Sequence, residues 1–144
     1  MKIIAVRISG RVGVREDIER TLDLLRLKIK HVAAILENTP EINGMIKKVQ
    51  HYIAYGEIND DTARLLVEKR GKLQGDKPVD AKRVEEFMSK FMKGEKKIEE
   101  IGIKPFFRLS PPKGGFKKST KLPWPKGVLG YQGEKINELV KRMI

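Results

Sequence analysis

Residues 39–58, TPEINGMIKKVQHYIAYGEI, predict one helix that leads directly into one strand. Thr39 can cap this helix through its hydroxyl, and the proline after it suits the first helical position, where no N–H is needed. One helix face carries apolar residues at the spacing i, i+3, i+4, i+7, namely Ile42, Met45, Ile46 and Val49. The other side carries the basic residues Lys47, Lys48 and His51. Residues 52–58 are rich in β-branched and aromatic side chains, which indicates a strand.

Two earlier strands and a helix complete the first part of the chain. Residues 2–8 (KIIAVRI) predict a strand, residues 15–27 a helix, and the apolar run at 32–36 a buried strand. The order over residues 1–58 is therefore β-α-β-α-β, an α/β core with one sheet and helices on one face. We expect Arg7 to pack its stem and form an ion pair at an edge of that sheet.

Residues 59–109 predict a helical extension of this core. A helix over 61–70 ends at a glycine, and a second helix begins after the capping residue Asp80. The second helix carries an apolar stripe at Val84, Phe87, Met88, Phe91 and Met92, which we interpret as core. Residues 106–109 predict a short strand that returns to a sheet edge.

Residues 110–144 form a third segment, a basic tail followed by a helix. The stretch 110–133 holds four prolines and five glycines, so we expect no regular element there. Residues 134–144 return to an amphipathic helical pattern through Ile136, Leu139, Val140 and Met143.

The charge of the chain points to a polyanionic partner. The 144 residues include 31 Lys and Arg against 19 Asp and Glu, a formal net charge of +12. A bias of this size in a small domain is typical of nucleic-acid binding. Charged thermophile surfaces are an alternative explanation for the 35% charged content, but they gain acids and bases together.

Composition also argues against several other classes of protein. There is no cysteine, which excludes disulfides, thiolate metal sites and cysteine nucleophiles and fits a reducing cytoplasm. The two histidines lack a metal-binding spacing, and the paired acids lie near helix starts or on polar faces. The apolar N-terminal stretch is too short for a membrane span. We therefore expect no catalytic residue, metal, cofactor or membrane partner.

The basic tail is the strongest candidate for chemistry. Its lysines can neutralise phosphates: Lys113, Lys117, Lys118, Lys121 and Lys126. Gly114 and Gly115 let the backbone approach a partner closely, and Phe116 and Trp124 can stack on unpaired bases of RNA. The alternative is a linker with surface lysines, although exposing two large aromatic side chains would be unfavourable.

A second candidate follows the first strand. Gly10 and Gly13, with Arg11 and Arg15, could form an anion-binding turn at a helix N-terminus. The spacing is not that of a phosphate-binding P-loop, and the two arginines suit a solvated loop equally well.

Several segments together carry a family resemblance. They are TLDLLRL (21–27), HVAAILENTP (31–40), GMIKKVQHYIAYGEI (44–58), DDTARLLVEKRGKL (60–73), FFRLSPPKGGFK (106–117) and LGYQGEKINELVKRM (129–143). Through them the chain resembles, over essentially its whole length, the long archaeal-type form of large-subunit ribosomal protein thirty, whose eukaryotic counterpart is numbered seven. Shorter bacterial members would end near Ile58.

The resemblance implies a three-stranded, ferredoxin-like α/β sandwich with a helical extension and a basic C-terminal tail. It implies a structural, non-enzymatic role in the large ribosomal subunit, in the cytoplasm. The implied partners are the large ribosomal RNA, neighbouring ribosomal proteins and, as a further candidate, the small ribosomal RNA of that subunit. The family's RNA contacts would fall on Arg11, Lys47, Lys48, Arg70, Lys72, Arg108 and the lysines of 113–126. The tail stretch STKLPWPKG departs from the more basic run of relatives.

Two alternative hypotheses come from the same sequence. The stretch SGRVGVRE (9–16) has a faint likeness to the acylphosphatase loop, with Arg15 as phosphate cradle and Asn38 as the water-positioning amide. That loop lacks the expected Gly-Phe-Arg ending, and the hypothesis leaves residues 59–144 unexplained. The second alternative is an RNA-binding module that acts outside the ribosome.

Overall fold

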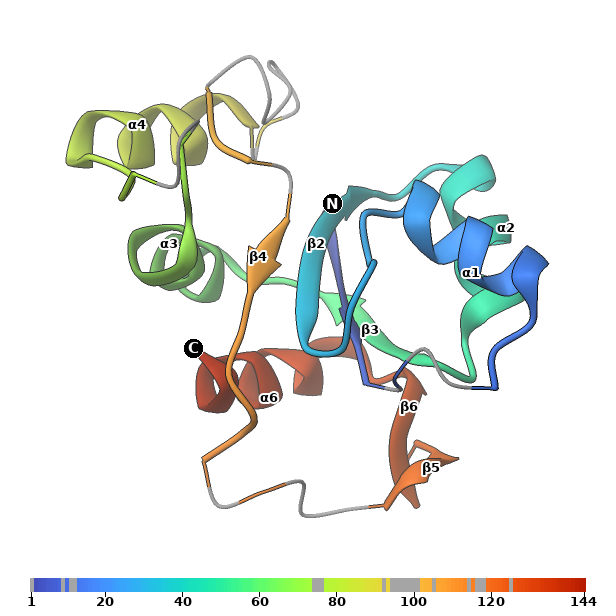
Figure 1. Cartoon of the computed structure of the whole chain (residues 1–144). Coiled ribbons are helices and arrows are strands. Elements are labelled where there is room, and N and C mark those ends of the chain that lie inside the picture. The colour runs from blue at the N-terminus through green and yellow to red at the C-terminus, as the bar shows by residue number, and fades with distance from the viewer. Residues whose placement is uncertain are drawn as a thin grey trace.

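The computed structural model describes residues 2–8, 10, 13–73, 77–91, 93, 102–104, 106–113, 115, 119–124 and 126–144. Its strands are β1 (Lys2–Arg7), β2 (Val32–Glu37), β3 (Ile53–Glu57), β4 (Phe107–Arg108), β5 (Ser119–Pro123) and β6 (Gly127–Tyr131). They form one sheet in the order β4-β2-β1-β3-β6-β5 (Figure 1). β1 is antiparallel to both β2 and β3. The predicted α/β class and β-α-β-α-β order are confirmed, but the three core strands belong to a sheet of six.

Helices cover both faces of this sheet. One face carries α1 (Glu16–Leu24) and α2 (Pro40–Val49) (Figure 1). The other carries α3 (Asp60–Arg70), α4 (Ala81–Glu86) with the π-helical turn Phe87–Phe91, and α6 (Ile136–Met143) after the 3-10 turn Gly133–Lys135. The expectation that the helices of residues 1–58 lie on one face of the sheet is therefore confirmed, and the segments after β3 cover the second face.

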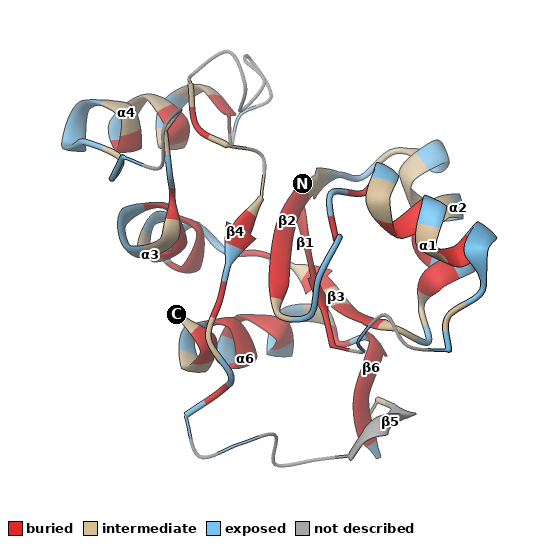
Figure 2. Cartoon of the chain, viewed as in Figure 1, coloured by how far each residue is buried: buried red, intermediate tan, exposed pale blue. Residues whose placement is uncertain are grey.

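The sequence of β1 explains why two helical layers are needed. Ile3 and Ala5 pack in the apolar cluster with α1 and α2, whereas Ile4 and Val6 pack in the cluster with α3 and α6. Successive side chains of a strand point to opposite faces, so a strand that is apolar at consecutive positions must be covered on both sides. Figure 2 shows β1 buried along its length.

Three of the helices have a side-chain cap at their N-terminus. The Thr39 hydroxyl accepts a hydrogen bond from the N–H of residue 42 at 3.3 Å, as predicted, and Asn59 and Asp80 cap α3 and α4 in the same way. The predicted core face of α2 is also confirmed, since Ile46 is 1% exposed and Val49 is fully buried. Their lysine neighbours in the helix are exposed.

α1 ends earlier than the sequence pattern indicates. The predicted helix ran to residue 27, but α1 ends at Leu24 and Arg26 adopts a φ of 67°. The Arg26 N–H donates to the Asp23 carbonyl, and the Leu27 N–H donates to the Leu22 carbonyl at 2.8 Å. This is the Schellman arrangement of a helix C-terminus, with an arginine at the position where glycine is usual. Leu25 and Leu27 remain buried beyond the helix end, so the apolar pattern of the sequence extends past the last helical residue.

The basic tail contains regular structure, contrary to expectation. β6 pairs with β3, with Ala54 opposite Gly130, and β5 pairs with β6. Pairing with a neighbouring strand supplies hydrogen-bond partners that local propensity does not reveal. Gly56 of β3 is required here, because a Cβ would overlap the carbonyl oxygen of Gly133 at the start of the next turn. The predicted C-terminal helix is confirmed as α6.

None of the helices that the structure describes is both long and apolar enough to cross a membrane.

Candidate nucleic-acid interface

The short strand β4 builds the edge of the sheet on which the candidate interface lies. It pairs with β2, with Val32 opposite Arg108 and Ala33 opposite Phe107, which confirms the predicted return to a sheet edge. Phe107 and Ala33 are fully buried in the cluster beneath α3. By the alternation of a strand, Arg108 and the preceding Phe106 lie on the opposite face, and Phe106 packs against the cluster of α1 and α2.

Two neighbouring hollows share Phe106 and Arg108 as a common wall. One hollow, of about 220 Å³, is lined by Lys69, Arg70, Lys72, Lys104, Phe106 and Arg108. The other, of about 320 Å³, is lined by Arg26, Lys28, Ile29, Val32, Phe106 and Arg108. We call these residues together the β4 basic surface. It brings seven basic side chains together, with no acidic residue among those that line the two hollows.

The end of α3 positions the first of these hollows. The last turn of α3 carries Lys69 and Arg70, and cations at a helix C-terminus are stabilised by the helix dipole. The Arg70 guanidinium donates to the Ser110 hydroxyl at 2.7 Å, which ties the helix to the chain just after β4. The Lys104 N–H donates to the Lys72 carbonyl at 2.8 Å, so these two lysines are held side by side.

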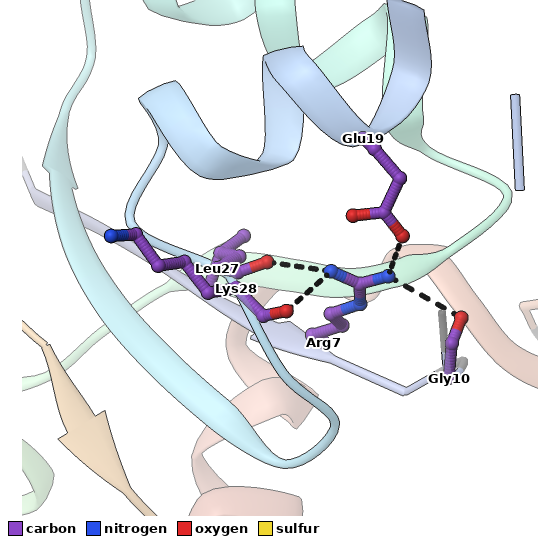
Figure 3. A network of polar contacts seen from close by, with 5 residues as sticks. All are labelled: Arg7, Gly10, Glu19, Leu27 and Lys28. Carbon is purple, nitrogen blue, oxygen red and sulfur yellow. Dashed lines mark hydrogen bonds and ion pairs between the residues drawn. The ribbon is translucent and has the colours of Figure 1, made fainter. Parts of the chain in front are cut away.

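The buried side chain of Arg7 holds the loop that lines the second hollow, through the contacts shown in Figure 3. Its side chain is fully buried, and its guanidinium donates to the carbonyl oxygens of Leu27 at 2.9 Å and Lys28 at 3.1 Å. The same group donates to the Glu19 carboxylate at 2.7 Å and the Gly10 carbonyl at 3.3 Å. The predicted ion pair is present, but its predicted location is wrong: β1 is a central strand, so Arg7 is interior rather than at a sheet edge.

These contacts fix the loop between α1 and β2, which carries Arg26 and Lys28 to the β4 basic surface. A buried guanidinium that satisfies several carbonyl oxygens avoids the large cost of an unpaired charge. The buried Arg7 thereby holds the loop in addition to the loop's own short-range hydrogen bonds.

A second surface, where β3 leads into α3 and meets the start of α6, has a different charge. A hollow of about 560 Å³ there is lined by Glu57, Ile58, Asn59, Glu134, Lys135, Asn137, Glu138 and Lys141. The Tyr131 hydroxyl donates to the Glu57 carboxylate at 2.5 Å, and this hydrogen bond raises the pKa of Tyr131. We call this the mixed-charge edge. The contrast between the two edges indicates that a polyanion would meet the protein at β4.

The residues predicted from the sequence fall into separate groups. Arg70, Lys72 and Arg108 come together on the β4 basic surface. The second group lies around α2, where Lys47, Lys48 and His51 are exposed.

Arg15 lies beside this second group. It forms an exposed ion pair with Asp17 at 3.4 Å, and the Lys48 ammonium is 4.0 Å from the same carboxylate. The first turn of α1 carries Glu16, Asp17 and Glu19, which already complement the positive end of the helix.

The tail residues form a third group. The Lys113 N–H donates to the Arg142 carbonyl at 3.0 Å, and the Arg142 side chain donates to the carbonyls of Lys113 and Gly115, so this turn is held against the end of α6. Trp124 is half-buried at the turn between β5 and β6, and Lys126 is exposed. The predicted contacts at Arg11, Gly114, Phe116, Lys117 and Lys118, and the side chain of Lys121, lie outside the described residues.

Sequence reasoning missed four of the seven basic residues of the β4 basic surface, and its aromatic residue. The residues that it did not select are Arg26, Lys28, Lys69, Lys104 and Phe106. They come from three separate stretches of sequence and meet only when β4 pairs with β2. The sequence between Gly102 and Gly133 contains no acidic residue, and this was the available signal for Lys104. No local pattern marks the others.

Within the described residues, no group of three or more His, Asp or Glu could hold a metal ion. The fold and the concentration of basic side chains at β4 define a class of protein. The chain is a small basic α/β protein that presents a cationic sheet edge.

Comparison with known proteins narrows this class to a family. Residues 3–53, which span β1 to the start of β3, match the family described as "Ribosomal protein L30p/L7e". A curated protein from Staphylothermus marinus named "Large ribosomal subunit protein uL30" is 42% identical over 155 residues, covering 96% of each chain. Its namesake from Nanoarchaeum equitans is 43% identical over 148 residues, again covering 96% of each. The chain belongs to the L30p/L7e family, and the resemblance inferred from the sequence is confirmed.

Membership of this family decides between the hypotheses about catalysis. The family is a structural, non-enzymatic one, so the acylphosphatase alternative is wrong. The geometry agrees, since Arg15 is paired with Asp17 and the Asn38 amide oxygen accepts a hydrogen bond from Asn43 at 2.8 Å.

Proposed function

We propose that the chain is a structural constituent of the large ribosomal subunit and that it binds ribosomal RNA chiefly through the β4 basic surface. The supporting observation is the gathering of seven cations from three stretches of chain around one half-buried aromatic, with no acid lining the hollows. Phosphate neutralisation by lysine and arginine supplies much of the affinity of such surfaces. The proposed setting is the cytoplasmic ribosome, as the names of the relatives suggest.

Two further surfaces are proposed as additional RNA contacts. The first is the exposed side of α2 with Lys47, Lys48 and His51, together with Arg15 beside it and with Arg11. The second is the tail, with the residues Lys113, Gly114, Gly115, Phe116, Lys117, Lys118, Lys121, Trp124 and Lys126. The proposed partners are the large ribosomal RNA, neighbouring ribosomal proteins and, as a further candidate, the small ribosomal RNA of the large subunit.

A charge-matched pair of variants tests the main surface. The double variant K69Q/K72Q removes two cations from the β4 basic surface, and K135Q/K141Q removes two from the mixed-charge edge. Because both change the net charge equally, a general electrostatic effect would weaken RNA binding equally. We expect only the first to lower affinity strongly and to reduce the slope of log K against log salt by about 0.7–0.9 per lost contact. Equal losses in the two variants would contradict the proposal.

A second experiment separates the ribosomal role from that of an RNA-binding module outside the ribosome. We expect the protein to co-sediment with large ribosomal subunits from a native lysate. Recovery only in light fractions, with RNA binding intact, would support the alternative.

A further inference from the structure

The two hollows of the β4 basic surface differ in chemistry. The hollow beside α3 is lined by five cations and Phe106. The hollow beside the α1–β2 loop is lined by three cations and three apolar side chains, among them Ile29 and Val32. The first suits phosphate groups only, whereas the second offers an apolar interior with a cationic rim.

The apolar interior has an exposed and a buried part. Val32 is 3% exposed and forms the floor, while Ile29 is 43% exposed, one of the few large apolar side chains left at the described surface. Phe106 is half-buried, with one side packed against the cluster of α1 and α2 and its remaining surface shared by both hollows. An aromatic ring supported from behind and bordered by cations is the arrangement that binds a nucleobase and its flanking phosphates.

We propose that the hollow lined by Ile29, Val32 and Phe106 receives one unpaired base of the RNA, with flanking phosphates on Arg26, Lys28 and Arg108. The strand then continues past Phe106 into the hollow beside α3. This inference rests on the proposed function and deepens it: the protein binds an RNA helix interrupted by an unpaired nucleotide in preference to an uninterrupted one. A base within a duplex cannot leave its stack without a cost of a few kcal/mol, so a fully paired helix would leave the hollow empty.

The test uses two RNA hairpins of the same stem sequence. One carries a single bulged 2-aminopurine, and the other lacks the bulge. We expect the full-length protein to bind the bulged hairpin about tenfold more tightly and to change the 2-aminopurine fluorescence, as stacking does. The variant F106L should remove most of this preference, because it should lower the affinity for the bulged hairpin much more than the affinity for the paired one. The variant F106Y keeps an aromatic ring and should retain the preference.

Y131L is the matched control, because it removes an aromatic ring that is 53% exposed on the mixed-charge edge. It should leave the preference unchanged. If both hairpins bind equally to the wild-type protein, or if Y131L abolishes the preference as F106L does, the proposal is overturned.

The outcomes separate this inference from the proposed function. If K69Q/K72Q weakens both hairpins but the bulge gives no advantage, only the present inference fails. If K69Q/K72Q weakens neither, the assignment of the RNA surface itself fails. An acidic peptide containing phenylalanine is titrated in parallel. Binding of that peptide that depends on Phe106, with equal binding of the two hairpins, would assign the hollow to a protein partner instead.

Discussion

Replacing Arg26 by glycine should stabilise the protein and weaken its binding to RNA. Arg26 lies two residues after the end of α1 and has a φ of 67°, in the left-handed region that favours glycine. An L-residue there costs roughly 1–2 kcal/mol. Glycine removes that cost but loses about 0.4–1 kcal/mol through its greater freedom in the unfolded chain. The net expectation is a gain of about 0.5–1 kcal/mol in the free energy of unfolding, relative to R26A.

R26A is the proper reference because it removes the same side chain and its surface contacts but keeps the backbone strain. The assay is urea unfolding of R26A and R26G, with thermal melting as a second measure. In a chain of this size, about 1 kcal/mol corresponds to roughly 2–4 °C in melting temperature. Both variants should lose RNA affinity equally, with the salt slope reduced by about 0.7–0.9 for one lost phosphate contact.

Two results would refute this reasoning. If R26G is less stable than R26A, the left-handed backbone is not strained and the helix end has another source of stability. If both variants bind RNA as tightly as the wild-type protein does, Arg26 does not belong to the interface. RNA binding would then not explain why an arginine stands where the backbone conformation favours glycine.

Three further predictions follow from the core and its buried groups. R7M should lower the free energy of unfolding by about 3–5 kcal/mol, because it removes the ion pair between Arg7 and the Glu19 carboxylate. Adding E19L should recover part of that loss. The absence of any recovery would argue against a stabilising role of the pair. I46A should cost about 2–5 kcal/mol in urea unfolding, and a loss below about 1 kcal/mol would contradict its core position. Burial and the nearby Lys30 lower the pKa of His31 below 6.5, so stability should be fully present above that pH and fall as the pH falls through the folded pKa. H31N should flatten this part of the pH profile, and an unchanged profile would assign the effect to other groups.

The helices and core strands could be predicted because their signals are local. The cap at Thr39, the apolar spacing of Ile46 and Val49, and the β-branched and aromatic composition of the strand after them are each signals within a few residues. The strands of the tail could not be predicted in this way. β6 forms because β3 offers it a partner, and Gly56 allows the following turn to approach, both of which are contacts between distant parts of the chain.

The same distinction explains the partial prediction of the site. Arg70, Lys72 and Arg108 were selected through the family resemblance, and the basic tail through its unusual composition. Phe106 was predicted only as part of a short strand at 106–109, because its place on the surface depends on the pairing of β4 with β2. A charge pattern in sequence shows that cations are abundant, whereas their concentration on one edge depends on which strands are neighbours.

The α1–β2 loop shows how stability is set against function in this chain. Both of its ends, Arg26 and His31, adopt a positive φ, which is uncommon for residues other than glycine. Arg7 holds the loop from inside, since its side chain donates to the carbonyls of Leu27 and Lys28 while its own carbonyl accepts from the His31 N–H at 2.8 Å.

Two costs are therefore combined in one short loop, a strained backbone and a buried guanidinium. Glycine in place of Arg26 would remove the first of these costs. Strained backbone persists only where the surrounding structure over-determines it, and such strain gathers at functional sites. The simplest physical account is that the loop is shaped to present Arg26 and Lys28 beside Phe106. The R26G variant should therefore gain stability relative to R26A and lose RNA affinity relative to the wild-type protein.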